Sequence, residues 1–405
     1  MRYIIILVVS FLVSSCQIGP HTKLQAGNYR ATLDVQDGKQ LPFNFKVRND
    51  DVIEIYNAEE VIEVDEITYF NDSIRINFPI FEGYLVGKFT DGVVSEGKYI
   101  KESLDRVVPV TITYDLSERF LNVKPTNKDI SGIWEMVFTE DDGATFIAKG
   151  IFEQDGNGMT GTIRTTTGDY RYLEGVVSGN LMEFSVFDGA HAFLFTGKVS
   201  NTGDNMKGEF YSGNHYRAVF KGRRNADFEL PHEDTLTFLK EGYDSLEFSF
   251  PDLQGNTISL SDEQFQGKAV VVQVMGSWCP NCLDESRYYS EYFKKNPSDD
   301  LKFVALAFEY AKTEEKAFAG LKRLKERVGI EYPILLAQYG TSDKEEAQKK
   351  LPMLYHVLSY PTTIFIDKKG KVRKIHTGFN GPATGDKYTE FKKEFEDFVD
   401  ELLSE

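Results

Sequence analysis

Cysteine, histidine and proline are scarce in this chain, which has 3 cysteines, 6 histidines and 13 prolines in 405 residues. A chain of this length can bury two or three cores without disulfides or a structural metal. The 13 prolines and 33 glycines are also too few for a fibrous or low-complexity protein. With 41% apolar residues, the composition is that of a folded chain with more than one domain.

Basic residues are in deficit, with 46 Lys and Arg against 63 Asp and Glu, so the formal net charge is -17. This balance argues against a nucleic-acid partner, which needs a basic face. Most of the net negative charge falls in residues 1–244. We interpret it as a well-solvated surface, with a face for cations or a basic partner as the alternative.

Long apolar runs are lacking apart from Tyr3–Val13, which is too short to span a bilayer but fits the core of a signal peptide. The run ends in Val13-Ser14-Ser15-Cys16, which resembles the bacterial lipobox. The resemblance implies removal of residues 1–15, lipidation of Cys16 and membrane anchoring through the linker 16–22. Gln17 follows the cysteine. By resemblance to the rules that sort lipoproteins in some bacteria, a residue other than Asp at this position implies the outer membrane, on the side that faces the periplasm. The alternative is an ordinary secretory signal and an unmodified cysteine.

Residues 23–225 alternate apolar and polar side chains between turn signals such as Asp37-Gly38 and Asp142-Gly143, which predicts an antiparallel all-β region. Gly27 and Gly132 begin similar segments at an offset of 105, so the region is predicted to be a duplication, with modules at 23–128 and 129–225. His191 and His215 lack a second ligand at metal spacing. We expect a spacer or a binding module without catalytic residues.

The pattern changes after a connector at 226–245, and strands then alternate with helices over 246–405, which predicts an α/β domain. The expected strands are 269–275, 303–308, 334–337, 362–367 and a last one ending at Ile375. The expected helices are 279–295, 314–328, 344–351 and 387–403.

A C-x-x-C motif, Cys279-Pro280-Asn281-Cys282, follows the buried strand 269–275 and opens a helix. This context indicates a redox dithiol. Free N–H groups at a helix start stabilise a thiolate, so we expect a lowered pKa at Cys279 and nucleophilic attack by its sulfur. Cys282 would then resolve the mixed disulfide. A zinc half-site is the alternative, but the chain lacks further soft ligands at metal spacing, so no metal or other cofactor is predicted.

These residues resemble the thioredoxin superfamily, and within it the TlpA/ResA-type thioredoxin-like lipoproteins, over roughly residues 246–403. Trp278 before the dithiol and Tyr360-Pro361 before the apolar 364–366 segment match the family pattern. The resemblance implies that Pro361 is a cis proline beside the disulfide. It also implies that Trp278, Tyr360 and Pro361 bind the substrate peptide.

Glu285 stands three residues after Cys282, as in the family's C-x-x-C-x-x-E pattern. Together with the helical spacing, the resemblance implies a carboxylate that takes the proton of Cys282. The alternative is a solvated helix residue. The chain departs from its relatives at two places. Proline follows the first cysteine, at Pro280-Asn281, and this dipeptide is similar to that of glutaredoxins and of the oxidant DsbA. Gln273 stands where thioredoxin has a buried acid.

The resemblance implies a membrane-anchored thiol-disulfide oxidoreductase that exchanges disulfides with periplasmic proteins through Cys279 and Cys282, as a reductant. A membrane redox donor or acceptor would be its second partner. A DsbA-like oxidant is one alternative, and a non-catalytic binding protein is another. A peroxiredoxin is disfavoured, since its pattern requires threonine and proline where Gly276 and Val272 stand.

Overall fold

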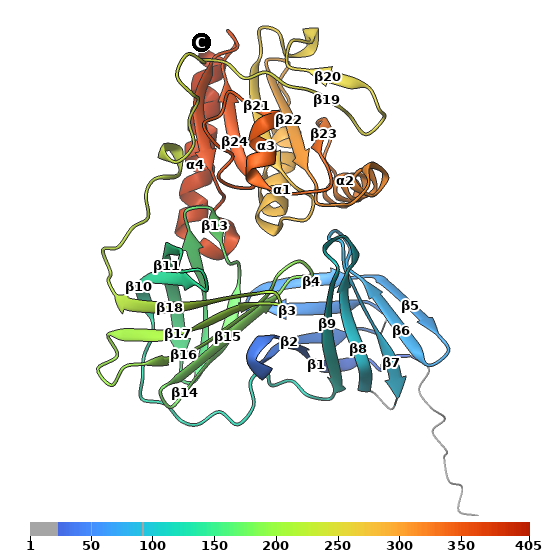
Figure 1. Cartoon of the computed structure of the whole chain (residues 1–405), viewed down its shortest axis with the longest axis vertical. Coiled ribbons are helices and arrows are strands. Elements are labelled where there is room, and N and C mark those ends of the chain that lie inside the picture. Colours follow the sequence, from blue (N-terminus) through green and yellow to red (C-terminus); the bar gives the residue numbers. More distant parts are fainter. Residues whose placement is uncertain (1–22, 50, 91–92) are drawn as a thin grey trace, which may run out of the picture.

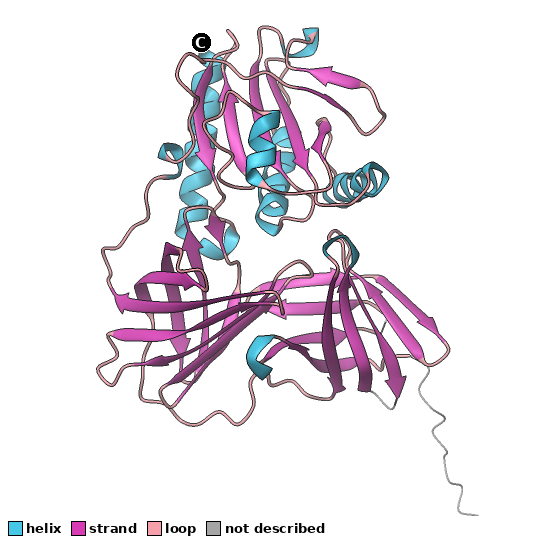
Figure 2. Cartoon of the chain, viewed as in Figure 1, coloured by secondary structure: helices cyan, strands magenta, loops and turns pink. Residues whose placement is uncertain are grey.

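The computed structural model describes residues 23–49, 51–90 and 93–405. The predicted signal peptide and Cys16 lie outside this range. Within it, no helix has both the length and the apolar character needed to cross a bilayer. Two β-rich parts lie side by side below a C-terminal part that carries the long helices (Figures 1 and 2).

The first part is a nine-stranded antiparallel sheet in the order β4-β3-β2-β1-β9-β8-β7-β6-β5. Strand β1 lies inside the sheet and pairs with β2 and β9, whereas β4 and β5 form its two edges and do not pair with each other. Alternate residues of β1 face the core, among them Tyr29, Ala31 and Leu33, as the period of two requires. The strands are β1 (Gly27–Asp34), β2 (Gln40–Val47), β3 (Ile53–Asn57), β4 (Glu60–Val64), β5 (Glu66–Phe70), β6 (Ser73–Asn77), β7 (Tyr84–Thr90), β8 (Val93–Lys101) and β9 (Arg106–Tyr114).

The second part is also a nine-stranded sheet, and it closes on itself through pairing of β11 with β12. Its interior is filled by aromatic and methionine side chains around the fully buried Trp134. The strands are β10 (Gly132–Glu140), β11 (Thr145–Asp155), β12 (Gly158–Thr165), β13 (Gly168–Asp169), β14 (Leu173–Ser178), β15 (Leu181–Phe187), β16 (Ala192–Val199), β17 (Asn205–Ser212) and β18 (Tyr216–Arg224).

The two sheets are alike in part. In each, the first strand pairs with the second and with the ninth, but only the second sheet is closed. Gly27 begins β1 and Gly132 begins β10. The duplication, with modules at 23–128 and 129–225, stays a prediction.

The C-terminal part contains a five-stranded sheet in the order β23-β22-β21-β24-β25. β21 is buried throughout and runs parallel to β22 and antiparallel to β24. The elements are β19 (Ser249–Pro251), β20 (Thr257–Ser259), β21 (Ala269–Met275), α1 (Pro280–Lys295), β22 (Leu301–Phe308), α2 (Glu314–Val328), β23 (Ile334–Gln338), α3 (Lys344–Lys350), β24 (Thr362–Ile366), β25 (Val372–Thr377) and α4 (Asp386–Ser404). The predicted fold class, a β region followed by an α/β domain, is confirmed.

Helices α1 and α4 pack together through aromatic rings. Tyr288 and Tyr289 of α1 contact Phe395 of α4 at ring-centroid distances of 5.4 and 5.0 Å. Burial of such rings dominates the energy of a core and fixes the axis of α1 against the sheet. The start of α1 is therefore held rigidly at the end of β21.

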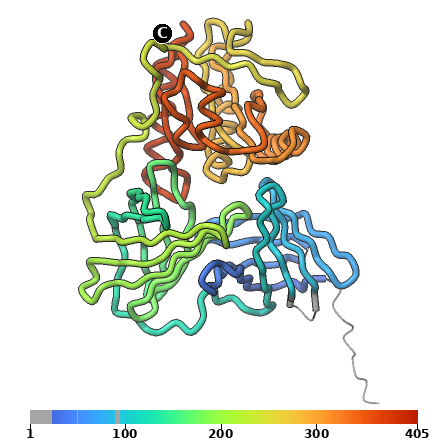
Figure 3. Tube along the Cα trace, in the orientation of Figure 1, coloured from blue at the N-terminus to red at the C-terminus, as the bar shows by residue number. Residues whose placement is uncertain are grey.

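The connector runs as an extended segment from the second sheet to the far end of the C-terminal domain (Figure 3). The first sheet meets α2 through surface ion pairs. Arg327 binds Asp65 and Glu66, at 2.9 and 2.8 Å. These two acids lie where the chain passes from the edge strand β4 to the edge strand β5. Exposed pairs of this kind contribute little individually.

A buried arginine, Arg171, joins three parts of the chain just after β13. Its guanidinium forms ion pairs with Glu60 of β4, Asp284 of α1 and Asp188, which follows β15. It also donates a hydrogen bond to the carbonyl oxygen of Pro280 at 3.2 Å. Burial alone would lower the pKa of Arg171, but the three carboxylates raise it, so the guanidinium stays charged.

Replacing Arg171 should separate these parts, because removal of one partner leaves buried carboxylates without a counter-charge. We expect Arg171→Met to lower the free energy of unfolding by about 3–5 kcal/mol in urea titrations of the full chain. Arg223→Met is the matched control, since its ion pair with Glu135 is exposed, and its loss should stay below about 1 kcal/mol. Equal losses in both variants would contradict the structural role of Arg171.

Candidate functional site

The dithiol lies where β21 ends and α1 begins. Cys279 is the residue before the first turn of α1, and the N–H of Cys282 donates to its sulfur at 3.1 Å. The two cysteines are disulfide-bonded, with their Cα atoms 5.2 Å apart. Cys282 is fully buried and Cys279 is 6% exposed. A thiolate at Cys279 would keep the Cys282 N–H as a hydrogen-bond donor, which favours attack by this sulfur.

The Tyr360–Pro361 loop faces the dithiol, and its peptide bond is cis, as the resemblance implies. The sulfur of Cys279 lies 3.4 Å from the carbonyl oxygen of Tyr360. The ring of Tyr360 packs edge-on against Trp278 at 5.5 Å. The structure therefore brings the predicted substrate-binding residues Trp278, Tyr360 and Pro361 to one side of Cys279.

Glu285 lies inside the domain, one helical turn beyond Cys282, and its side chain is fully buried. Its carboxylate accepts hydrogen bonds from Gln273 (2.7 Å), Thr363 (2.8 Å) and Tyr289 (3.1 Å). The Gln273 amide also lies 3.4 Å from the carbonyl oxygen of Cys282. Gln273, the residue in place of thioredoxin's acid, thus links Glu285 to the backbone of Cys282.

Burial raises the pKa of Glu285 to about 7, while the hydrogen bonds from Gln273, Thr363 and Tyr289 oppose the rise. Such a carboxyl group exchanges its proton near neutral pH, as a general acid or base must. The predicted alternative, a solvated helix carboxylate, is inconsistent with this burial.

A second buried acid, Glu309, follows β22 on the other side of the motif. It accepts hydrogen bonds from the N–H and the hydroxyl of Ser277, both at 2.7 Å. Burial raises its pKa to about 7. The sequence analysis missed this residue, although a single acid directly after the apolar strand 303–308 was a detectable signal.

The β region contacts the dithiol through residues 165–172, which we name the covering loop. The amide of Asn281 donates to the carbonyl oxygen of Asp169 at 3.1 Å, and the Ser359 hydroxyl donates to that of Thr167 at 2.8 Å. Gly168 has φ +137°, and a Cβ atom there would lie 2.3 Å from the Asn281 amide. The expected spacer is thus in direct contact with the C-x-x-C motif and with the residue before Tyr360.

Two of the described histidines are paired with carboxylates. His376 is paired with Asp234 at 2.9 Å and His191 with Asp188 at 3.2 Å. Across residues 23–49, 51–90 and 93–405, no cluster of three or more His, Cys, Asp or Glu side chains is arranged to hold a metal ion.

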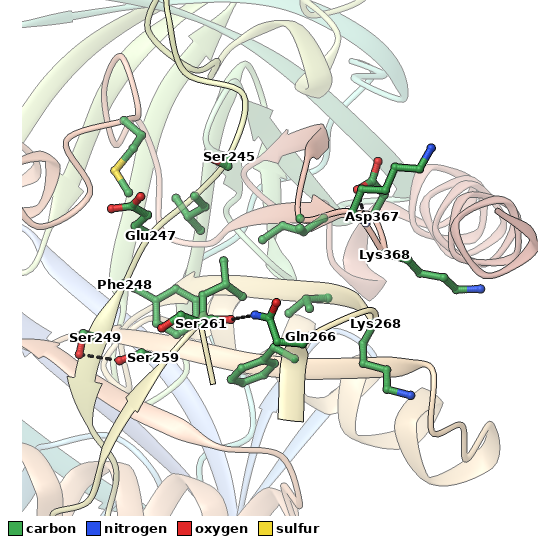
Figure 4. A pocket seen from close by; sticks show the side chains of 18 of the residues that line it. Ser245, Glu247, Phe248, Ser249, Ser259, Ser261, Gln266, Lys268, Asp367 and Lys368 are labelled. Carbon is green, nitrogen blue, oxygen red and sulfur yellow. Dashed lines mark hydrogen bonds between the residues drawn. The ribbon is translucent and has the colours of Figure 1, made fainter. Parts of the chain in front are cut away.

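A cavity of about 820 Å³ lies at the opposite end of the strands that carry the site (Figure 4). Its wall includes Val270, at the start of β21, and Ile366, at the end of β24. Ser249 and Ser259 of the β19–β20 hairpin are joined by a hydrogen bond of 2.7 Å at its edge. None of the predicted site residues lines this cavity.

Comparison with known proteins agrees with this geometry. The model of the AhpC/TSA family matches residues 242–375. The thioredoxin-like protein YneN of Bacillus subtilis is 31% identical over 140 residues, which cover 35% of this chain and 73% of YneN. The thiol-disulfide oxidoreductase ResA of Geobacillus thermodenitrificans is 30% identical over 142 residues, 35% of this chain and 72% of ResA.

Among solved structures, a thiol-disulfide oxidoreductase from Bacteroides fragilis matches with 20% identity and a TM-score of 0.27, covering 37% of this chain and 99% of that one. The sequence relatives are similar to the C-terminal domain, which carries Cys279 and Cys282. The chain therefore belongs to the TlpA/ResA-type thioredoxin-like proteins and is a thiol-disulfide oxidoreductase.

Proposed function

We propose that the protein reduces disulfides of extracytoplasmic proteins from a lipid anchor at Cys16, facing the periplasm. The observation that carries the chemistry is the asymmetry of the dithiol. Cys279 lies beside the Tyr360 backbone, and Cys282 lies in the interior near the buried Glu285. The anchor and the compartment are supported by Val13-Ser14-Ser15-Cys16 alone.

The exchange proceeds in two steps. The Cys279 thiolate attacks one sulfur of the substrate disulfide, which breaks that bond and forms a mixed disulfide. Glu285 then takes the proton of Cys282, directly or through a water molecule, and the Cys282 sulfur attacks Cys279. The substrate leaves with two thiols, and the enzyme holds the Cys279–Cys282 disulfide until a membrane dithiol donor reduces it.

Access to Cys279 requires movement of the covering loop. Cys279 is 6% exposed. Asn281 of the motif and Ser359, next to Tyr360, are both hydrogen-bonded to the loop. A protein disulfide is too large to reach this sulfur directly. We propose that the tip of this loop, residues 166–169, withdraws when the substrate binds, while Arg171 keeps its ion pairs with Glu60, Asp188 and Asp284.

Single cysteine variants test the exchange. We expect Cys279→Ser to abolish reduction of a model peptide disulfide, because it removes the attacking sulfur. Cys282→Ser should accumulate the mixed disulfide at Cys279, visible by mass spectrometry. Wild-type turnover in both variants would refute the proposal, and preferential oxidation of reduced peptides by the wild type would favour the oxidant alternative.

The role of Glu285 is tested by the second step. Glu285→Gln keeps the shape of the side chain but cannot accept the proton, so we expect decay of the mixed disulfide at pH 7 to slow by about 100-fold. Stopped-flow quenching followed by mass spectrometry measures this decay. Glu291→Gln, an exposed acid of the same helix, is the control. Unchanged decay in Glu285→Gln would remove Glu285 from the mechanism.

The raised pKa of Glu285 should also make the free energy of unfolding fall as the pH rises. Its pKa of about 7 in the fold lies above the ordinary 4.5, so the folded state binds an extra proton between these values. Its contribution to stability is therefore full below pH 4.5 and is lost as pH rises to about 7. The wild type should lose on the order of 3 kcal/mol relative to Glu285→Gln over this interval, measured by urea unfolding. Parallel pH profiles would contradict the raised pKa.

A further inference from the structure

A pocket of about 320 Å³ lies beside Trp278, between the two β sheets and the C-terminal domain. Aromatic rings form much of its wall, from Tyr99, Phe193, Trp278 and Tyr310. Trp278 contacts Tyr310 at 5.6 Å and precedes the nucleophilic Cys279 in the chain. The covering loop contacts the motif at Asn281, whereas this pocket contacts it at Trp278, directly before Cys279.

Two cationic side chains, Lys101 and Arg106, face the pocket from β8 and β9. Lys101 is 8% exposed, and its ammonium donates to the carbonyl oxygen of Ala190 at 2.5 Å. Among the described residues, no ion pair within 4.0 Å joins either cation to a carboxylate. Burial lowers the pKa values of both groups, so their charges are poorly solvated.

Two acids act on the charge of Lys101, namely Asp188 and Glu82, and both have other partners, although the Oε2 atom of Glu82 is buried without a hydrogen bond. Asp188 is bound by Arg171 and His191, at 3.4 and 3.2 Å. Glu82 accepts hydrogen bonds from the N–H and the hydroxyl of Ser103, at 3.1 and 2.8 Å. The pocket therefore keeps two positive charges that an anionic ligand would compensate, and its aromatic wall would exclude water from that contact.

We propose that this pocket binds a carboxylate of the substrate close to its disulfide, so that the enzyme prefers acidic substrates. The inference rests on the proposed exchange at Cys279. Lys101 and Arg106 act as specificity residues, because they select the charge beside the reacting sulfur and take no part in the exchange itself.

Two small disulfides of opposite charge test the preference. Oxidised glutathione carries free carboxylates, whereas cystamine carries only ammonium groups. We expect the reduced wild-type protein to react with oxidised glutathione at a kcat/KM at least tenfold higher than with cystamine. Arg106→Met and Lys101→Met should each lower the value for glutathione about tenfold, mainly through KM, and leave that for cystamine unchanged or higher.

Two further variants separate charge from structure. Arg106→Lys keeps the charge and should retain most of the preference. Lys98→Met removes an exposed cation of β8, the strand of Lys101, that does not line the pocket. This variant should change the kcat/KM of neither disulfide. Equal reactivity of the wild type with both disulfides, or equal losses for both in Arg106→Met, would overturn the inference. If the wild type reduced neither disulfide, the proposed exchange itself would fail.

Discussion

One buried guanidinium, that of Arg171, determines how the three parts of the chain meet. Its ion pairs reach β4 of the first sheet, the end of β15 in the second, and α1 of the redox domain. A desolvated cation is stable only with its partners in place, so this contact has few alternative geometries. Arg171 lies in the covering loop, so the same contact keeps this loop over Asn281.

The redox domain places its buried acids on two sides of one motif. Glu285 lies behind Cys282 and is joined to it through Gln273, whereas Glu309 holds Ser277 before Trp278. Both acids have a raised pKa of about 7 because of burial. The protonation of the site therefore changes close to neutral pH, while its polar side chains remain fixed by hydrogen bonds.

Local patterns predicted much of this molecule. The expected strand 269–275 and helix 314–328 match β21 and α2, since their periodicities are strong. The C-x-x-C motif and Tyr360-Pro361 were recognisable because each is a short run of sequence. The contact of Arg171 with Pro280 joins residues 109 positions apart, and no periodicity or spacing encodes such a pair. The covering loop and the cationic pocket were missed for this reason.

The covering loop places one domain across the reactive group of another. The carbonyl oxygens of Asp169 and Thr167 accept hydrogen bonds from Asn281 and Ser359, on the motif and beside Tyr360. Cys279 is 6% exposed and Cys282 is fully buried in this arrangement. The reactivity of the dithiol is therefore set in part by a domain that contributes no atom to the disulfide.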